Sequence, residues 1–283
     1  MKIERKYKAI IDDGISTRTI AYPLTVDFDI QRDMFSKMNT AKFTFKNLNE
    51  TSQAWLYHDK FFTTKFKTIT FQAGYNNNYT TIYKGNIVSG YSQRQGTEMN
   101  TQIECFEGAF DYHNNFANSS MSAGSTGADI INNMITSSSF EKGYIASTTK
   151  TYTRGYTYQG NILDGLRNVA DESGCNSFLD LGTVNVLGEN DVIESEVLLI
   201  TAQTGFLNTP IRQNQLITLE MIFEPRLKLG QLVRLDSSLN YLDGQYKVLA
   251  VSHSGNISGA IGGKAITKLS LWSGGKTFNM ITR

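Results

Sequence analysis

Residues 68–108 read TITFQAGYNNNYTTIYKGNIVSGYSQRQGTEMNTQIECFEG and carry the clearest structural pattern in the chain. Apolar side chains occupy every second position from Ile69 to Tyr75, which is the period of a β-strand with one buried face. The asparagines at 76–78 predict a turn, because asparagine tolerates the left-handed backbone conformation. Two further strands are predicted at 80–87 and 101–106, the second after a polar turn through Gly96. The stretch therefore predicts a β-rich fold.

The segment ahead of this stretch predicts another strand and one helix. Ala41, Phe43 and Phe45 alternate with polar residues, as in a half-buried strand. Residues 52–58 lack such alternation and predict a short helix. The first hundred residues are thus expected to be mostly strands.

The middle of the chain has helical patterns instead. Thr126 and Asp129 have the spacing of a capping box and precede an apolar stripe, so a helix is predicted to begin there. A second helix is predicted over 162–172, because its apolar residues gather on one face and Gly174 is a natural stop. Between the two helices, residues 144–158 are rich in Thr and Tyr and predict extended structure.

The last hundred residues return to strand patterns. Strands are predicted at 178–186, 192–201, 216–223, 232–235, 245–252 and 266–272. Asp243-Gly244 predicts a hairpin turn, and the glycine-rich segment 255–264 predicts a flexible loop. The order of segments predicts a mainly β fold, with two barrels or sandwiches flanking a small mixed α/β part. The expected domains are residues 1–115, 116–187 and 188–283.

The composition of the 283-residue chain narrows its class. A hydrophobic content of 40% supports a folded core and excludes wholesale disorder. A formal net charge of +1 argues against a general nucleic-acid binder and against attachment to anionic lipid by charge alone. Only 19% of residues are charged, so uncharged polar groups must cover much of the surface. Such a surface suits permanent contact between subunits and equally suits an ordinary neutral protein.

The N-terminus and the cysteines bear on location. The apolar run after MKIERKYK ends at Asp12 and Asp13 and is too short for a secretory signal. No stretch approaches the ~18 apolar residues of a membrane-spanning helix. We therefore expect synthesis in a cytoplasm and no membrane insertion. Cys105 and Cys175 lie far apart and form no CxxC motif, which predicts reduced, buried thiols.

No catalytic, cofactor or metal site is predicted. His58, His113 and His253 are the only histidines, and none has a partner at metal-ligand spacing. Residues 259–264 are superficially similar to a phosphate-binding loop. The spacing is one residue short, however, and Ala265 stands where Ser or Thr would bind magnesium. We reject this match.

The remaining candidates for catalysis are one cysteine and two pairs of carboxylates. Cys175 follows a predicted helix end, whereas a reactive cysteine favours a helix N-terminus, so a structural role is the better interpretation. The carboxylate pairs are Asp171 with Glu172 and Glu194 with Glu196. The second pair would share one strand face, as a hydrolase could use, but a solvated charged face explains it equally well. An enzyme is therefore the weakest hypothesis.

Aromatic residues are abundant, with 14 Tyr and 16 Phe. Most of the phenylalanines fit inward strand positions and indicate core packing. Tyr75, Tyr79 and Tyr83 flank the 76–78 turn and are expected to be partly exposed. There they would suit a subunit interface or a glycan-binding surface.

Three segments resemble the hub proteins of phage tail tips and baseplates, a family also found in contractile injection systems. Residues 68–108 resemble a stretch in which a strand ending in GY leads to an IYKGNI-like strand. Residues 160–187 resemble the family's helix and short sheet, and residues 223–255 resemble its C-terminal barrel. The motif positions in that barrel are Pro225, Leu227, Gly230, Val233, Leu235, Gly244, Tyr246, Val248 and His253.

The resemblance implies a structural protein and not an enzyme. It implies two tube-like β-barrel domains and a homotrimer whose six barrels continue the hexameric tail tube. The chain would join the tube to a central spike or fibre protein at the distal end of the virion tail, after assembly in the host cytoplasm. Other implied partners are the tail tube protein, the tape-measure protein and further baseplate proteins. The open alternatives are a distal tail ring protein with one barrel per subunit, and a receptor- or glycan-binding tail-tip protein.

A conduit for DNA carries its own electrostatic requirement. DNA would pass through the lumen without sequence-specific binding, and Lys or Arg there would hold it through phosphate contacts. A neutral or acidic lumen is therefore predicted. The sequence does not indicate which residues line the lumen or which form the subunit contacts.

Overall fold

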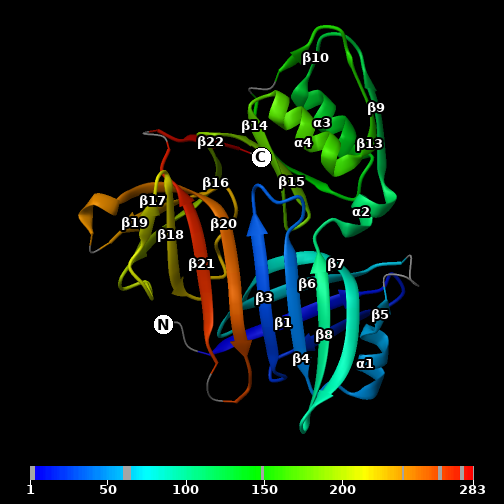
Figure 1. Cartoon of the computed structure of the whole chain (residues 1–283), viewed down its shortest axis with the longest axis vertical. Coiled ribbons are helices and arrows are strands. Elements are labelled where there is room, and N and C mark those ends of the chain that lie inside the picture. The colour runs from blue at the N-terminus through cyan, green and yellow to red at the C-terminus, as the bar shows by residue number, and fades with distance from the viewer. Residues whose placement is uncertain are drawn as a thin grey trace.

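Strands make up most of the chain, and most of them join one continuous sheet (Figure 1). The computed structural model describes residues 4–59, 65–147, 150–237, 239–260, 263–274 and 277–282. Within these residues the main sheet has 15 strands, and three small sheets accompany it. The predicted mainly β fold with a small α/β part is confirmed.

The first group of strands, blue to cyan in Figure 1, wraps around an aromatic core. As the alternation predicted, Phe43 and Phe45 are buried, and the Phe43 and Phe71 ring centroids lie 4.6 Å apart. The strands run in the order β3-β4-β8-β7-β6-β1-β2. The elements are β1 Arg5–Asp12, β2 Thr17–Ala21, β3 Val26–Asp33, β4 Thr40–Lys46, α1 Glu50–Leu56, β5 His58–Asp59, β6 Lys67–Tyr75, β7 Asn78–Gln95 and β8 Glu98–Phe106.

The middle of the chain, green in Figure 1, forms a small α/β unit with a separate core. Thr126 and Asp129 form the predicted capping box at the start of α3, and α4 spans the predicted residues 162–172. No described helix is long and apolar enough to cross a lipid bilayer. The elements are α2 Ala109–Asn114, β9 Phe116–Met121, β10 Ser125–Thr126, α3 Gly127–Thr136, β11 Glu141–Ile145, β12 Thr151–Tyr152, β13 Tyr156–Asn161, α4 Ile162–Glu172, β14 Cys175–Asp180 and β15 Thr183–Gly188.

The last group of strands, yellow to red in Figure 1, has its own aliphatic core. Val233, Val248 and Leu271 are fully buried there, at inward positions of three neighbouring strands. The elements are β16 Asp191–Thr201, β17 Ile211–Gln213, β18 Leu216–Ile222, β19 Gln231–Asp236, the 3₁₀ helix Asn240–Leu242, β20 Gly244–Ile257, β21 Ala265–Trp272 and β22 Asn279–Ile281.

The two strand groups meet through one strand of each. β3 pairs antiparallel with β20, from Val26 opposite Ile257 to Asp33 opposite Ala250. The front of the molecule in Figure 1 is therefore a continuous sheet in the order β17-β18-β21-β20-β3-β4-β8-β7. Because the joint is a run of backbone hydrogen bonds, it fixes the two groups rigidly side by side.

Residues 178–186 form a hairpin and not the single predicted strand. Between β14 and β15, Leu181 has φ +56° and Gly182 has φ +85°. Two consecutive positive φ angles are typical of the type I′ turn that closes a two-residue hairpin. Leucine rarely adopts this conformation, so the Leu-Gly pair gave no recognisable turn signal.

Two turn predictions in the last third were also wrong in position. Gly244 is already the first residue of β20, and the connection from β19 contains the 3₁₀ helix. Asp243 acts in that connection by accepting a hydrogen bond from the Ser237 N–H at 2.7 Å. β20 continues through Ile257, so the first residues of the predicted 255–264 loop are strand. Residues 261 and 262 of that loop lie outside the described residues.

Candidate functional site

The outer face of the continuous sheet is polar where the two strand groups meet. Two rows of side chains cross it: Glu220, Lys268, Ser252 and Gln31 in one row, and Ser254, Asp29, Lys42 and Glu104 in the next. We call this surface the polar sheet face. A hollow of about 550 Å³ lies along it, over β3, β20 and β21. The small serines of β20 leave this space open between the longer side chains on either side.

Three lysines of this surface each form an ion pair with a glutamate on the neighbouring strand of the sheet. Lys42 lies 2.8 Å from Glu104, Lys46 lies 2.9 Å from Glu98, and Lys268 lies 2.7 Å from Glu220. The hydrogen bond with Glu104 raises the pKa of Lys42, and that with Lys268 lowers the pKa of Glu220. Each of the three pairs brings one positive and one negative side chain together, so their charges offset one another.

Three aspartates of β3 carry negative charge on the same side of the sheet. Asp27 accepts a hydrogen bond from the Asn256 side chain at 2.6 Å, and Asp29 accepts one from Gln31 at 2.7 Å. Asp33 accepts from the Phe35 N–H at 2.6 Å. Within the described part of the chain none of the three takes part in an ion pair. The surface is thus neutral to acidic.

Behind the polar sheet face, the side chain of Arg32 forms hydrogen bonds with the other two parts of the chain. This β3 residue is 2% exposed. Its guanidinium donates to the Asp180 carboxylate at the end of β14, at 2.8 Å, and to the Leu227 carbonyl oxygen, also at 2.8 Å. Asp180 belongs to the α/β unit, and Leu227 lies between β18 and β19. One side chain therefore bridges all three parts of the chain.

A second buried group, Glu107, lies at the same junction. Its carboxylate accepts hydrogen bonds from the Asn39 side chain at 2.6 Å and from the Gly182 N–H at 2.5 Å. Asn39 also donates to the Leu179 carbonyl oxygen at 2.7 Å. Burial, together with the nearby Asp180 carboxylate, raises the pKa of Glu107 to about 8 in spite of these donors. We call Arg32, Asn39, Glu107 and Asp180 the buried polar junction.

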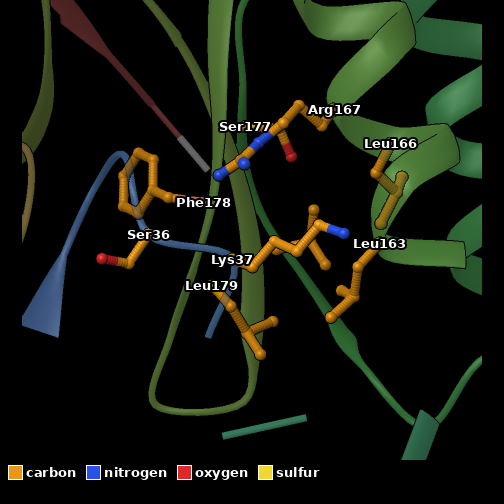
Figure 2. A pocket seen from close by; sticks show the side chains of 9 residues that line it. Ser36, Lys37, Leu163, Leu166, Arg167, Ser177, Phe178 and Leu179 are labelled. Atoms are coloured by element: carbon orange, nitrogen blue, oxygen red, sulfur yellow. The ribbon is translucent and has the colours of Figure 1, made fainter. Parts of the chain in front are cut away.

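The loop between β3 and β4 holds the α/β unit from outside. Lys37 lies 2.7 Å from Asp164 of α4, and Arg167 donates to the Phe35 carbonyl oxygen at 2.8 Å. Figure 2 shows Lys37 running across the space between Leu163 and Leu179. This cavity of about 20 Å³ is a small gap between loop, helix and strand. Lys37 and Arg167, its two charged residues, are engaged in holding the loop, so it fits a structural joint better than a ligand site.

The histidines and cysteines are placed as structural residues. His253 is fully buried in β20, its Nδ1 lies 2.9 Å from the Thr267 hydroxyl, and burial lowers its pKa well below the usual range. His58 is buried and His113 is exposed. Among the described residues no three His, Cys, Asp or Glu side chains gather as metal ligands. Cys105 and Cys175 are free and buried, and burial raises the pKa of both thiols.

The candidate carboxylates are not brought together in a cleft. Glu194 and Glu196 are exposed on β16, and Glu196 lies 3.7 Å from Arg226. Asp171 and Glu172 are exposed at the end of α4. Glu172 there pairs with Lys150 at 3.1 Å and accepts a hydrogen bond from Tyr152. The solvated-face interpretation accounts for both pairs.

The tyrosine prediction was wrong for one of its three residues. Tyr83 is fully buried in the aromatic core, and burial raises its pKa well above the usual value. Tyr75 and Tyr79 are half-buried: the Tyr75 hydroxyl donates to the Phe223 carbonyl oxygen at 2.8 Å, and Lys8 lies 4.4 Å above the Tyr79 ring. Strict alternation would place Tyr83 outward. The pairing of β6 with β7 is irregular at this point, because Phe71 pairs with Tyr83 whereas Gln72 pairs with Thr81, and Tyr83 therefore points into the core.

Sequence reasoning missed the buried polar junction altogether. Arg32 and Asp180 are 148 positions apart, and Asn39 and Glu107 are 68 apart. None of the four belongs to a recognisable motif. The one available signal was in β3, where Val26, Phe28 and Ile30 alternate with polar residues and Arg32 takes the next apolar position of that pattern.

Comparison with known proteins identifies a family and several solved structures with the same fold. The family model described as baseplate hub gp41 matches residues 8–254. The fold is similar to the tail protein from Neisseria meningitidis MC58, with TM-score 0.63, 10% identity, and coverage of 95% of this chain and 97% of that one. It is also similar to the 43 kDa tail protein of prophage MuSo2 from Shewanella oneidensis, with TM-score 0.62, 7% identity, and coverage of 94% and 97%.

A third similar structure comes from a secretion system. The E. coli c3393 protein is a type VI secretion component with structural similarity to the T4 bacteriophage tail proteins gp27 and gp5. It matches with TM-score 0.60 and 8% identity, over 91% of this chain and 76% of that one. No curated protein is significantly similar in sequence. Because the family model covers most of the chain and the fold agrees with it, this protein belongs to the baseplate hub gp41 family and is a structural component of a phage tail, not an enzyme.

Proposed function

We propose that the chain is a trimeric adaptor at the distal end of the tail, where it joins the tail tube to a central spike or fibre protein and forms part of the ejection conduit. The observation that carries this proposal is the joining of two strand groups, each with its own core, into one continuous sheet through β3 and β20. Three copies would present six such groups, which matches the number of subunits in a hexameric tube. A distal tail ring protein with one barrel per subunit fits this arrangement less well.

We also propose a division into domains at residues 1–115, 116–187 and 188–283, which the three separate cores support. Each range contains most of one core, and the buried polar junction lies where the three cores meet. Neighbours in the virion would be the tube, spike, tape-measure and other baseplate proteins, and assembly would take place in the host cytoplasm.

The polar sheet face is the surface that suits the lumen of the conduit. Its three lysines are neutralised by Glu98, Glu104 and Glu220, and the β3 aspartates add negative charge. Such a surface repels phosphates, so DNA can pass without being held. This agrees with the neutral or acidic lumen expected for a conduit.

The trimer is tested by the molar mass of the purified chain. We expect light scattering to give three times the chain mass of 31.6 kDa at micromolar concentration. A mass of six chains would favour the ring protein instead. A single chain at every concentration up to the solubility limit would refute the trimeric adaptor.

The role of the polar sheet face in the lumen is tested by removing the carboxylates that pair with its three lysines. The triple variant Glu98→Gln, Glu104→Gln and Glu220→Gln should bind double-stranded DNA, with a salt dependence steeper by about one unit of log–log slope per freed lysine. Fluorescence anisotropy with labelled DNA at several salt concentrations measures this slope. The matched control changes net charge equally at exposed glutamates elsewhere, by Glu50→Gln, Glu189→Gln and Glu194→Gln. Equal DNA binding by both triple variants would remove the polar sheet face from the lumen.

A further inference from the structure

The two strand groups repeat the same arrangement. In the first group β3, β4, β8, β7, β6 and β1 follow one another across the sheet, and in the second group β17, β18, β21, β20, β19 and β16 do so. The corresponding strands also come in the same order along the chain, from β1 with β16 to β8 with β21. One difference is that β16 runs parallel to β19, whereas β1 runs antiparallel to β6.

Shared irregularities align the two groups residue by residue. β7 has a register shift between Ile87 and Ser89 where it pairs with β8, and β20 has one between Val248 and Ala250 where it pairs with β21. Ser89 therefore corresponds to Ala250, and Gln93 corresponds to Ser254. In the first group Ser89 lies in one row across the sheet with Glu104, Lys42 and Asp29. In the second group Ala250 lies in one row with Ser270, Thr218 and Ile211. Ile211 of β17 therefore corresponds to Asp29 of β3.

The junction inside the chain uses only one of two equivalent edges. The C-terminal half of β20 pairs with β3, and Ser254 lies opposite Asp29. The equivalent half of β7, from Tyr91 to Gln95, pairs with β8 on one side and has no strand partner on the other within the described residues. The equivalent of β3 is β17, whose one strand partner in the described part of the chain is β18. Each copy thus carries both halves of a second junction, but they are not joined to each other.

These two edges lie on opposite flanks of the molecule, β17 on the left and β7 on the right in Figure 1. They cannot meet within one chain, but they can meet between copies in a head-to-tail contact that closes a ring. Residues 91–97 and all of β17 are exposed, with Tyr91 at 43% and Ile211 at 59%. An exposed strand edge is otherwise a site of uncontrolled association, so a dedicated partner strand accounts for both edges.

We propose that β7 of one copy pairs antiparallel with β17 of the next copy, in the register that places Tyr91 opposite Gln213, Ser92 opposite Arg212 and Gln93 opposite Ile211. This register copies the internal junction, in which Ser252, His253 and Ser254 lie opposite Gln31, Ile30 and Asp29. The pairing extends the polar sheet face from one copy to the next without interruption. It rests on the proposed trimer and specifies which residues form its contacts.

A disulfide across the proposed register provides the test. Residues directly opposite in an antiparallel pair have Cα atoms about 4.5–5.5 Å apart, within the range of a disulfide. The variant Gln93→Cys with Ile211→Cys should form covalent dimers and trimers, and no larger ladder, on non-reducing gels after mild oxidation. The matched control keeps Gln93→Cys and combines it with Gln213→Cys, two positions along β17, where the Cα separation of about 8 Å is too long. The native cysteines are buried and should not react.

The outcomes separate this junction from the trimer itself when light scattering is run on the same samples. Trimers that crosslink through 93 and 211 but not through 93 and 213 support the junction and its register. Trimers that do not crosslink through 93 and 211, or that crosslink equally in the control, overturn it while leaving the trimeric adaptor intact. A strict monomer overturns both.

Charge pairing gives a second measurement that does not depend on disulfide geometry. Gln93→Lys with Ile211→Lys places like charges directly opposite one another and should weaken self-association roughly fivefold per junction. Gln93→Lys with Ile211→Glu should restore it to the original level or better. If the two double variants dissociate at the same concentration, these residues do not face each other.

Discussion

Replacing Arg32 with methionine should lower the free energy of unfolding by about 3–5 kcal/mol, because it leaves a carboxylate buried without its partner. The Asp180 side chain is 8% exposed, and Arg32 is the residue that pairs with it, at 2.8 Å. The Leu227 carbonyl oxygen loses its donor in the same variant. Urea denaturation followed by circular dichroism measures the loss.

A rescue and a control identify the cause of this loss. The double variant Arg32→Met with Asp180→Leu removes both charges and should recover most of the stability, since a buried pair can be replaced by apolar groups at little cost. The control Lys268→Met breaks the exposed pair with Glu220 and should change stability little. Equal losses for Arg32→Met and Lys268→Met would mean that the buried polar junction does not hold the three cores together.

Raising the pH from about 5 to 8 should destabilise the chain through Glu107. In the unfolded chain this carboxyl has its ordinary pKa of 4.5, and in the folded chain the pKa is about 8. Between these values the folded chain keeps a proton that the unfolded chain has released. Stability from this group is therefore complete below about pH 4.5 and is lost as the pH rises through 8, by up to roughly 5 kcal/mol in total.

The variant Glu107→Gln isolates this contribution, because it cannot titrate. The difference in unfolding free energy between the native chain and the variant should fall by up to about 1.4 kcal/mol per pH unit, measured by urea denaturation at pH 5, 6, 7 and 8. The variant also turns an amide donor toward the Asn39 donor, so its absolute stability is not the quantity to compare. His253 and His58, whose pKa values burial lowers, contribute in the opposite direction below about pH 6.5 and cancel in the difference. Parallel pH profiles for the two proteins would show that Glu107 is ionised throughout.

The elements that could be predicted are those that depend on local chemistry. The capping box at Thr126, the helix over 162–172 and the strand through Phe43 and Phe45 follow from side-chain spacing over a few residues, and the structure has all three. The hairpin at Leu181-Gly182 was missed because its turn uses leucine in a left-handed conformation. The neighbouring parts of the chain, and not local preference, hold that turn in place: Gly182 donates to Glu107 at 2.5 Å.

The alternating pattern was enough to predict a mainly β fold, and the three segments that resemble tail hub proteins implied a structural protein. They could do so because strand period and residue chemistry act within a few positions of one another. The tertiary structure decided the remaining features: the pairing of strand edges, the ion pairs of the lysines and the side chain that contacts all three cores. These features depend on pairs such as Arg32 with Asp180, or β3 with β20, that lie more than a hundred positions apart. Only the folded backbone brings such residues within hydrogen-bonding distance, and the repeat of one strand order in two groups becomes visible only there.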